Sequence, residues 1–159
     1  MRTYIRLALL AIVISCVIIA FATVDRNSDE TQIRTMIHST VTSIAKRDLG
    51  GTIACVSSNY KDSTGMTYER LRMLVAQALR VESDYNASAN IKSIRIDGDK
   101  AEVGLHFTVT ATKGGSPIYE RDLTLHLAKE DARHAWIIPV KVWRVTSVDG
   151  LALESEIKL

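Results

Sequence analysis

Hydrophobic positions follow three successive patterns along the chain. Residues 7–24 are apolar without interruption (LALLAIVISCVIIAFATV). Apolar residues then recur every three or four positions, from Ile33 to Ala45 and again from Tyr68 to Leu79, which predicts amphipathic helices. After Ser83-Asp84 the period changes to two, as far as about Val148, which predicts β-strands. The chain is therefore expected to form helices first and strands afterwards.

The helical part is expected to contain two principal helices with a shorter segment between them. Asp29 is predicted to cap the first helix, and Gly50-Gly51 is predicted to stop it. The apolar residues of the segment 53–56 predict one or two further helical turns. Thr67 is the expected N-cap of the next helix, since Ser and Thr are favoured there.

Four consecutive strands are expected after the helices. Asp97-Gly98-Asp99 is a hairpin signal, and residues 101–112 beyond it alternate clearly between apolar and polar side chains. The strand 119–127 follows a Gly-rich turn, and a last strand from about His134 to Val148 is apolar on both faces. Pro139 in that strand predicts an edge or bulge position. Short turns imply antiparallel pairing, and helices on one face of such a sheet make an α+β domain.

The apolar stretch 7–24 predicts export of the domain. Arg2 and Arg6 precede it and acidic residues follow it, which places the N-terminus in the cytoplasm and the rest outside. The stretch is long enough to anchor the chain in a membrane. It is also compatible with a signal peptide cleaved after Ala22, and less well with a lipoprotein signal at Cys16. The domain is expected at the inner membrane, facing the periplasm or cell exterior, or secreted if the signal is cleaved.

These patterns predict four regions. Residues 1–24 form a signal peptide or a single membrane anchor, and residues 25–28 a polar linker. Residues 29–149 form one α+β domain, and residues 150–159 a C-terminal tail. The length of 159 residues fits one such domain.

Composition and charge exclude several classes of protein. Hydrophobic residues make up 47% and charged residues 24% of the chain, as in ordinary globular proteins. The net charge of +2 lacks the basic excess typical of a nucleic-acid-binding protein. The two cysteines, Cys16 and Cys55, cannot form a disulfide framework, and Cys55 is expected to be a small buried hydrophobic residue.

Three stretches make the chain resemble the nuclear transport factor two-like superfamily, also called the SnoaL-like or cystatin-like cone. The first is the end of the opening helix, residues 45–49 (AKRDL), followed by residues 56–62 (VSSNYKD). The second is residues 65–72 (GMTYERLR), and the third is residues 96–103 (IDGDKAEV), which lead into the long hairpins. The resemblance implies helices packed on a curved antiparallel sheet of about four to six strands, preceded by one hydrophobic helix. It also implies a conical pocket between the helices and the sheet. With the apolar stretch 7–24, the chain resembles a membrane-tethered bacterial member of this superfamily. The superfamily hosts both enzymes and binding domains, so the fold does not fix the chemistry.

Five residues are candidates for lining that pocket as ligand-binding residues: Tyr60, Tyr68, Tyr119, Arg121 and His38. Tyrosines at a pocket rim, with Arg121 paired to a surface acid, are the alternative interpretation. The cavity-facing positions of residues 101–127 offer no carboxylate, whereas an enolising isomerase needs a carboxylate base and an oxyanion donor. No catalytic residue and no cofactor is therefore predicted.

Histidines and threonines gather on the other face of the predicted sheet. His106 and His126 are expected to be diagonal neighbours there, together with Glu102 and Asp122. Such a group could bind a divalent ion, but no recognised metal-binding spacing supports it, and no metal is predicted. The threonine-rich surface is either plain solvated sheet or the contact of a homodimer.

The leading functional hypothesis is a membrane-tethered extracytoplasmic binding or interaction domain that is not catalytic. Its partners would be the membrane, through residues 7–24, and a small apolar ligand or a protein. An isomerase or dehydratase of a small apolar substrate is one alternative. A structural subunit of an envelope or secretion assembly is the other.

Overall fold

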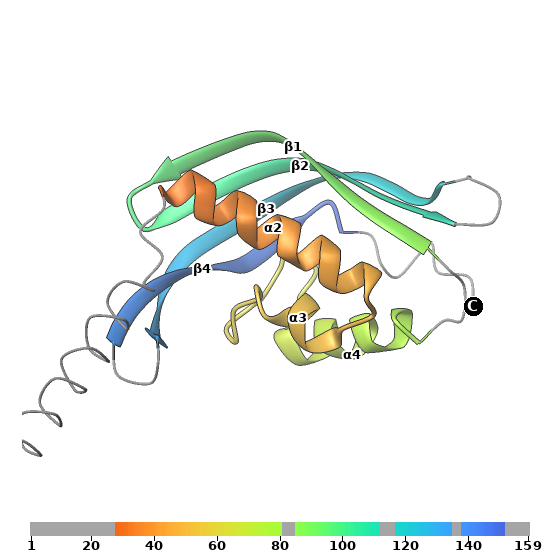
Figure 1. Ribbon diagram of the computed structural model, residues 1–159, viewed down its shortest axis with the longest axis horizontal. Coiled ribbons are helices and arrows are strands. Elements are labelled where there is room, and N and C mark those ends of the chain that lie inside the picture. The colour runs from red at the N-terminus through yellow and green to blue at the C-terminus, as the bar shows by residue number, and fades with distance from the viewer. Residues whose placement is uncertain (1–27, 81–84, 112–116, 135–137, 152–159) are drawn as a thin grey trace, which may run out of the picture. The chain divides into compact units, whose positions relative to one another are not determined.

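A curved, four-stranded antiparallel sheet forms one layer of the structure (Figure 1). The computed structural model describes residues 28–80, 85–111, 117–134 and 138–151. The strands are β1 (Tyr85–Asp97), β2 (Lys100–Ala111), β3 (Pro117–His134) and β4 (Ile138–Asp149), and they lie in the order β1-β2-β3-β4. Each strand pairs with its neighbour in the chain, as the short turns predicted.

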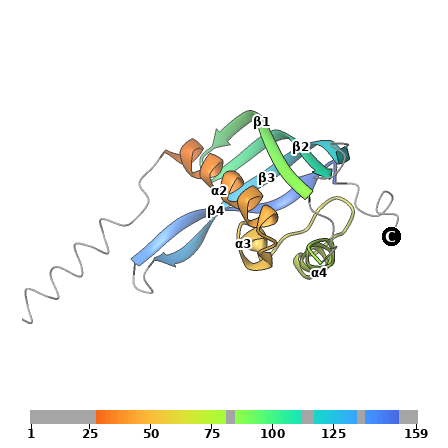
Figure 2. The same ribbon diagram turned by 45° about the vertical axis from the view of Figure 1, so that its right-hand side comes forward.

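Three helices lie on the same side of this sheet (Figures 1 and 2). They are α2 (Asp29–Ala45), α3 (Leu49–Ile53) and α4 (Tyr68–Ala78). The predicted α+β class is therefore confirmed. Ile33 and Ile37 of α2 are buried against the sheet because they lie one turn apart on the same face of the helix.

The described chain divides into two compact units. The larger unit contains Ser28–Lys129 and continues from Trp143. The smaller contains the described tips of β3 and β4, Glu130–His134 and Ile138–Val142. The hydrophobic core belongs to the larger unit: Ile33, Ile37, Ile53, Tyr60, Met66, Leu71, Ala101, Val103, Leu105, Leu123, Leu127, Trp143, Val145 and Val148.

The register of the sheet decides which side chains face the helices. In β2 and β3, Val103 lies opposite Leu125, and Leu105 lies opposite Leu123. These odd-numbered positions face the core, and Val103 is completely buried. Asp97 pairs with Lys100 across the tight hairpin that the sequence predicted.

The outer edge of β4 is covered by the segment that follows α3. The backbone of Val145 donates to the carbonyl of Cys55 at 2.8 Å, and its own carbonyl accepts from Ser57 at 2.9 Å. Lys61 then donates to the carbonyl of Thr146 at 3.0 Å. This parallel contact, centred on Val56 and Val145, joins segments about ninety residues apart in the chain and closes one side of the core.

The start of α2 differs from the prediction by one residue. Ser28 is the N-cap, and its side chain accepts from the backbone of Thr31 at 3.4 Å. The carboxylate of Asp29 instead accepts from Lys129 at 2.9 Å and from the indole of Trp143 at 3.2 Å. Asp29 therefore ties the start of α2 to β3 and β4.

The glycine pair also has a different role from the predicted one. α2 ends at Ala45, and Arg47 turns the chain with a φ of 57°. Gly50 and Gly51 lie inside α3, so they do not stop the first helix. At Gly51 a Cβ atom would collide with Ser43 Oγ and would lie 2.6 Å from Asp48 Oδ2, so this position needs a residue without a side chain.

The last predicted strand and the predicted N-terminal anchor or signal have different outcomes. The predicted last strand was wrong at its start, because His134 ends β3 and β4 begins at Ile138. The predicted anchor or signal, residues 1–24, lies outside the described residues. Within the ranges that are described, no helix has the length and hydropathy needed to cross a membrane.

Candidate functional site

An apolar cavity of about 200 Å³ lies between α2 and the concave face of the sheet. Helix α2 supplies one wall, and β2, β3 and β4 supply the opposite one. The lining residues are Met36, Ile37, Thr40, Val41, Ile44, Thr52, Cys55, Val56, Tyr60, Leu71, Ala89, Leu105, Phe107, Leu123, Leu125, Val145, Val148 and Leu151. For comparison, an engineered apolar cavity of about 150 Å³ stays dry and binds benzene.

The wall from α2 follows from helical spacing. Met36, Thr40 and Ile44 recur every four residues, and Ile37 and Val41 lie beside them on the same face. The sheet wall follows from alternation, since the odd-numbered residues of β2 and β3 share one face. The sequence predicted both apolar stripes.

The polar groups of the lining residues form hydrogen bonds within the chain. Thr40 Oγ1 donates to the carbonyl of Met36 at 2.9 Å, and Thr52 Oγ1 donates to the carbonyl of Asp48 at 2.7 Å. The thiol of Cys55 donates to the carbonyl of Thr52 at 3.6 Å. Among the described residues that line the cavity there is no Asp, Glu, His, Lys or Arg. The lining therefore presents hydrocarbon and internally satisfied hydroxyl and thiol groups to any occupant.

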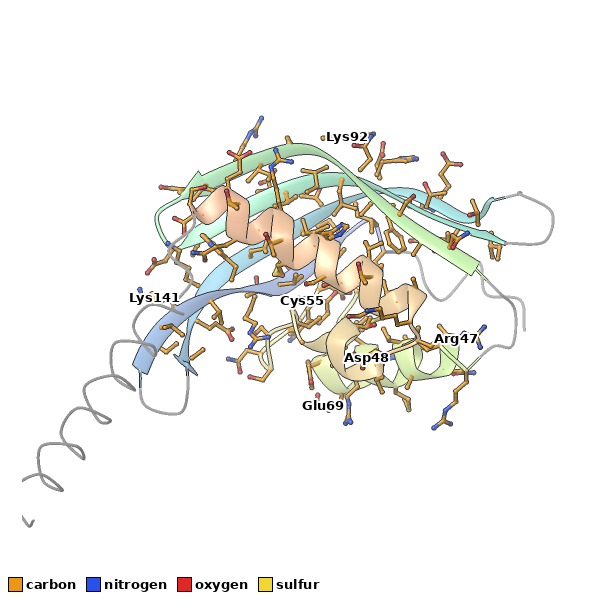
Figure 3. All side chains as sticks on the ribbon, in the orientation of Figure 1. Arg47, Asp48, Cys55, Glu69, Lys92 and Lys141 are labelled. Carbon is orange, nitrogen blue, oxygen red and sulfur yellow. The ribbon has the colours of Figure 1, made fainter. Side chains whose placement is uncertain are left out.

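Cys55 is the candidate nucleophile of this wall, and its environment keeps it a thiol. It lies on the segment after α3, beside β4 (Figure 3). Burial raises the pKa of Cys55 above its ordinary value, and the lowering effects of Thr40 and Arg144 do not offset this. Because the thiolate is the reactive form, Cys55 is part of the apolar wall and has little nucleophilic character.

Among the lining residues, Tyr60 has the hydroxyl group that a catalytic role would need, but this hydroxyl is hydrogen-bonded to the carboxylate of Asp62. Its hydroxyl donates to Asp62 Oδ2 at 3.3 Å. Burial and the charge of Asp62 raise the pKa of Tyr60 well above its ordinary value. The Tyr60 hydroxyl therefore stays protonated and directed toward Asp62.

Asp62 is buried and organises the loop before α4. Its Oδ1 accepts from the backbone of Thr64 at 2.9 Å, from the Thr64 hydroxyl at 2.7 Å and from the backbone of Met66 at 3.0 Å. Burial disfavours the ionised carboxyl, but these hydrogen bonds outweigh it and hold the pKa of Asp62 below its usual range. A carboxylate stabilised in this way is a weak base, and Asp62 is not among the lining residues.

The structure separates the five predicted pocket residues. Tyr60 lines the cavity. Tyr68, at the start of α4, packs half-buried against the core outside the lining, and His38 is exposed on α2. Tyr119 and Arg121 lie on the cavity side of β3, just beyond the lining residues. Tyr119 packs edge-on against Phe107, with ring centroids 6.2 Å apart.

The outer face of the sheet carries a chain of alternating charges. His106 Nδ1 lies 2.7 Å from Asp122 Oδ1, and its Nε2 lies 3.0 Å from Glu120 Oε1. Lys92, which points away from the helices in Figure 3, pairs with Asp122 at 2.6 Å. Hydrogen bonds with Asp122 and Glu120 raise the pKa of His106, and those with Lys92 and His106 lower the pKa of Asp122.

The predicted diagonal pairing of His106 with His126 was wrong. His106 lies opposite Asp122, whereas His126 lies opposite Glu102, four positions along the ladder. This register separates the two histidines into different pairs, and His126 bonds Asp149 at 2.8 Å. In the described part of the chain, no group of three or more His, Cys, Asp or Glu is placed to hold a metal ion.

Thr40, Thr52, Ala89 and Leu151 line the cavity but escaped the sequence analysis. Ala89 lies in the first half of β1, where the sequence YNASAN alternates with period two but carries only small apolar side chains after Tyr85. Leu151 falls in the segment predicted to be a tail, yet it lines the cavity. An apolar residue directly after the strand was the signal that could have placed Leu151.

Solved structures share this arrangement of helices and sheet. A domain of unknown function with a cystatin-like fold from Nostoc punctiforme PCC 73102 matches with a TM-score of 0.61 and 12% identity, over 78% of this chain and 76% of that one. An NTF-2 like protein of unknown function from Shewanella oneidensis MR-1 matches with a TM-score of 0.61 and 16% identity, over 76% and 97%. The chain has the nuclear transport factor two-like fold. Aln2 from a Streptomyces species shares the fold with a TM-score of 0.60 and 14% identity, over 78% and 91%.

At these identities the likeness concerns the nuclear transport factor two-like fold alone. No family model matches the chain, and none of the curated proteins matches it. The function of this nuclear transport factor two-like domain must therefore be argued from its own cavity.

Proposed function

We propose that the domain binds a small apolar ligand in the cavity and does not transform it. The observation that carries this proposal is the chemistry of the lining: about 200 Å³ of space whose walls are hydrocarbon and internally bonded polar groups. The polar groups of the walls already bond within the chain, so an apolar molecule that enters this space breaks no hydrogen bonds there. It also removes its own apolar surface from water.

Two features support binding over an isomerase or dehydratase reaction. Proton abstraction next to a carbonyl needs a base within hydrogen-bond reach of the substrate. Asp62 is a stabilised carboxylate behind Tyr60, and Cys55 is held as a thiol, so neither is poised for that role. A ligand in this cavity would meet packing surfaces and no proton donor or acceptor with a suitable pKa.

Cavity filling tests this proposal. Ala89→Leu, on β1, is expected to fill part of the cavity, whereas Ala87→Leu lies two residues away on the same strand and outside the lining. Ethylbenzene should raise the melting temperature of the wild-type protein and of Ala87→Leu, because a ligand that binds only the native state stabilises it. It should leave Ala89→Leu unchanged.

A second readout follows occupancy of the cavity directly. Modification of Cys55 by a small thiol reagent, followed by peptide mass spectrometry, should slow when ethylbenzene is present. The proposal is wrong if ethylbenzene neither stabilises the wild-type protein nor protects Cys55. It is also wrong if Ala89→Leu responds as strongly as Ala87→Leu.

The domain is further proposed to face the outside of the cell on a membrane tether. The charge pattern around residues 7–24 supports this: two arginines precede the apolar stretch, and Asp25, Arg26, Asp29 and Glu30 follow it. Cell fractionation combined with protease treatment of spheroplasts tests the topology. Degradation of the domain from outside is expected, and full protection in intact spheroplasts would overturn the proposal.

A further inference from the structure

The apolar wall of the cavity stops at a defined place on the sheet. Along β2 it reaches Phe107, and along β3 it reaches Leu123. The register places Arg121 directly opposite Phe107 and two residues before Leu123 on the same face. The first side chain beyond the hydrocarbon wall of β3 is therefore a guanidinium.

Arg121 can reach the end of the cavity. Residues directly opposite in an antiparallel pair have Cβ atoms about 5 Å apart, so the stem of Arg121 starts beside the ring of Phe107. The side chain is half-buried, and Tyr119 stacks its ring edge-on against the same Phe107. The long, flexible stem of Arg121 allows its charged group to extend toward that end of the cavity.

Charges are distributed unevenly between the two faces of the sheet. The acidic residues Glu102, Glu120 and Asp122 are on the outer face of the sheet. There His106 pairs with Glu120 and Asp122, and Lys92 pairs with Asp122. Within residues 101–109 of β2 and 119–127 of β3, the described positions on the cavity side carry a single charged residue, Arg121. Arg121 is therefore the charged group of this face of β2 and β3 that an anionic ligand would meet.

The chemistry of the Arg121 guanidinium indicates which class of anion it would bind. Arg121 also interacts within the chain, and a guanidinium has five N–H donors, so it can hold ligand oxygens beside an intrachain partner. Its planar fork matches the two oxygens of a carboxylate. A ligand with a hydrocarbon body and a carboxylate would contact the apolar lining and Arg121 at the same time.

We propose that the ligand of this domain is a small carboxylic acid, with its hydrocarbon body in the cavity and its carboxylate paired with Arg121. The inference rests on the proposed binding function and adds the class of ligand. The cavity volume of about 200 Å³ limits the buried body to one substituted ring or a short alkyl chain. A phosphate-headed or sugar-headed ligand would place more polar surface at Phe107 than one guanidinium can satisfy.

Two probes with the same hydrocarbon body distinguish burial of that body in the cavity from pairing of the carboxylate with Arg121. Phenylpropanoate carries a carboxylate, and phenylpropanol carries a neutral hydroxyl in its place. The full chain should bind phenylpropanoate about tenfold more tightly, as one charge-assisted interaction allows. Titration calorimetry at neutral pH measures both affinities.

Substitution of the arginine should remove the preference for the acid. Arg121→Gln is expected to weaken phenylpropanoate binding about tenfold and to change phenylpropanol binding less than about twofold. Arg95→Gln is the matched control, because Arg95 lies on the outer face of β1 opposite Glu102. It should leave both affinities unchanged.

Each result supports or overturns the inference. Equal affinities of the wild-type chain for the two probes would overturn it, as would an equal loss of both in Arg121→Gln. If ethylbenzene binds and neither oxygen-containing probe does, the carboxylate proposal fails while the binding function stands. If ethylbenzene does not bind, the binding function fails and the carboxylate proposal fails with it.

Discussion

Asp62 illustrates how a single buried carboxylate fixes a loop. Its Oδ1 accepts three hydrogen bonds from Thr64 and Met66, and its Oδ2 accepts one from Tyr60. The loop between α3 and α4, and the position of Tyr60 in the cavity wall, depend on this one side chain.

Replacing Asp62 should destabilise the protein in proportion to the acceptors lost. Asp62→Ala leaves two backbone amides without an acceptor and should lower the free energy of unfolding by about 3 kcal/mol. Asp62→Asn keeps Oδ1 as an acceptor and should cost about 1 kcal/mol. Urea unfolding at neutral pH measures both, and equal losses would contradict this account.

His106 should make stability depend on pH in a predictable direction. Its pKa is raised by Asp122 and Glu120, so its contribution is fully present below the unfolded pKa of about 6.5 and is lost as the pH rises through the folded pKa. His106→Gln should therefore destabilise the protein more at pH 5.5 than at pH 9. The exposed His38 on α2 provides the control, His38→Gln. A His106→Gln effect that grows with pH would refute the assignment.

At the scale of elements, predictions succeeded where a pattern depends on near neighbours. The strand 101–112 and the hairpin at Gly98 were predicted because alternation and turn residues are local signals. Asp29 was misassigned as a cap because its partners, Lys129 and Trp143, are 100 and 114 residues away. The boundary between β3 and β4 was missed because the apolar run on both faces hid the turn.

The joint between α2 and α3 distinguishes two adjacent glycines. Gly51→Ala should destabilise the protein by about 2 kcal/mol, because its Cβ would collide with Ser43 and crowd Asp48. Gly50→Ala meets only Asp48 Oδ1, at 3.3 Å, and should be neutral or stabilising by up to about 1 kcal/mol through higher helix propensity. Thermal unfolding of the two variants compares them, and equal melting temperatures would contradict this interpretation.

At the scale of the whole molecule, the sequence pattern predicted the layers, whereas the pocket was expected only from the resemblance and most of its lining residues were not predicted. The stripes of α2 and of β2 and β3 indicated which faces meet. The remaining volume depends on how α2, the sheet and the segment from Cys55 to Tyr60 pack together, and no single stretch of sequence encodes it. For the same reason, the sequence suggested Tyr68 and His38 for a pocket that they do not line.

The location of the core predicts the outcome of truncation. The buried core residues fall between Ile33 and Val148, so residues 28–159 should unfold cooperatively and with nearly the same urea midpoint as the full chain. Urea denaturation followed by tryptophan fluorescence makes the comparison. Loss of cooperative unfolding on removal of residues 1–27 would show that the core is incomplete without them.

The contact between Val56 and Val145 has a consequence for the order of folding. The hairpins of the sheet connect residues close in sequence, whereas this parallel contact closes a loop of about ninety residues. Contacts of such high sequence separation are expected to form late, because the chain loses the entropy of loop closure before they can stabilise it. We therefore expect the cavity wall to be completed after the folding barrier, so that an occupant slows unfolding and leaves the refolding rate unchanged.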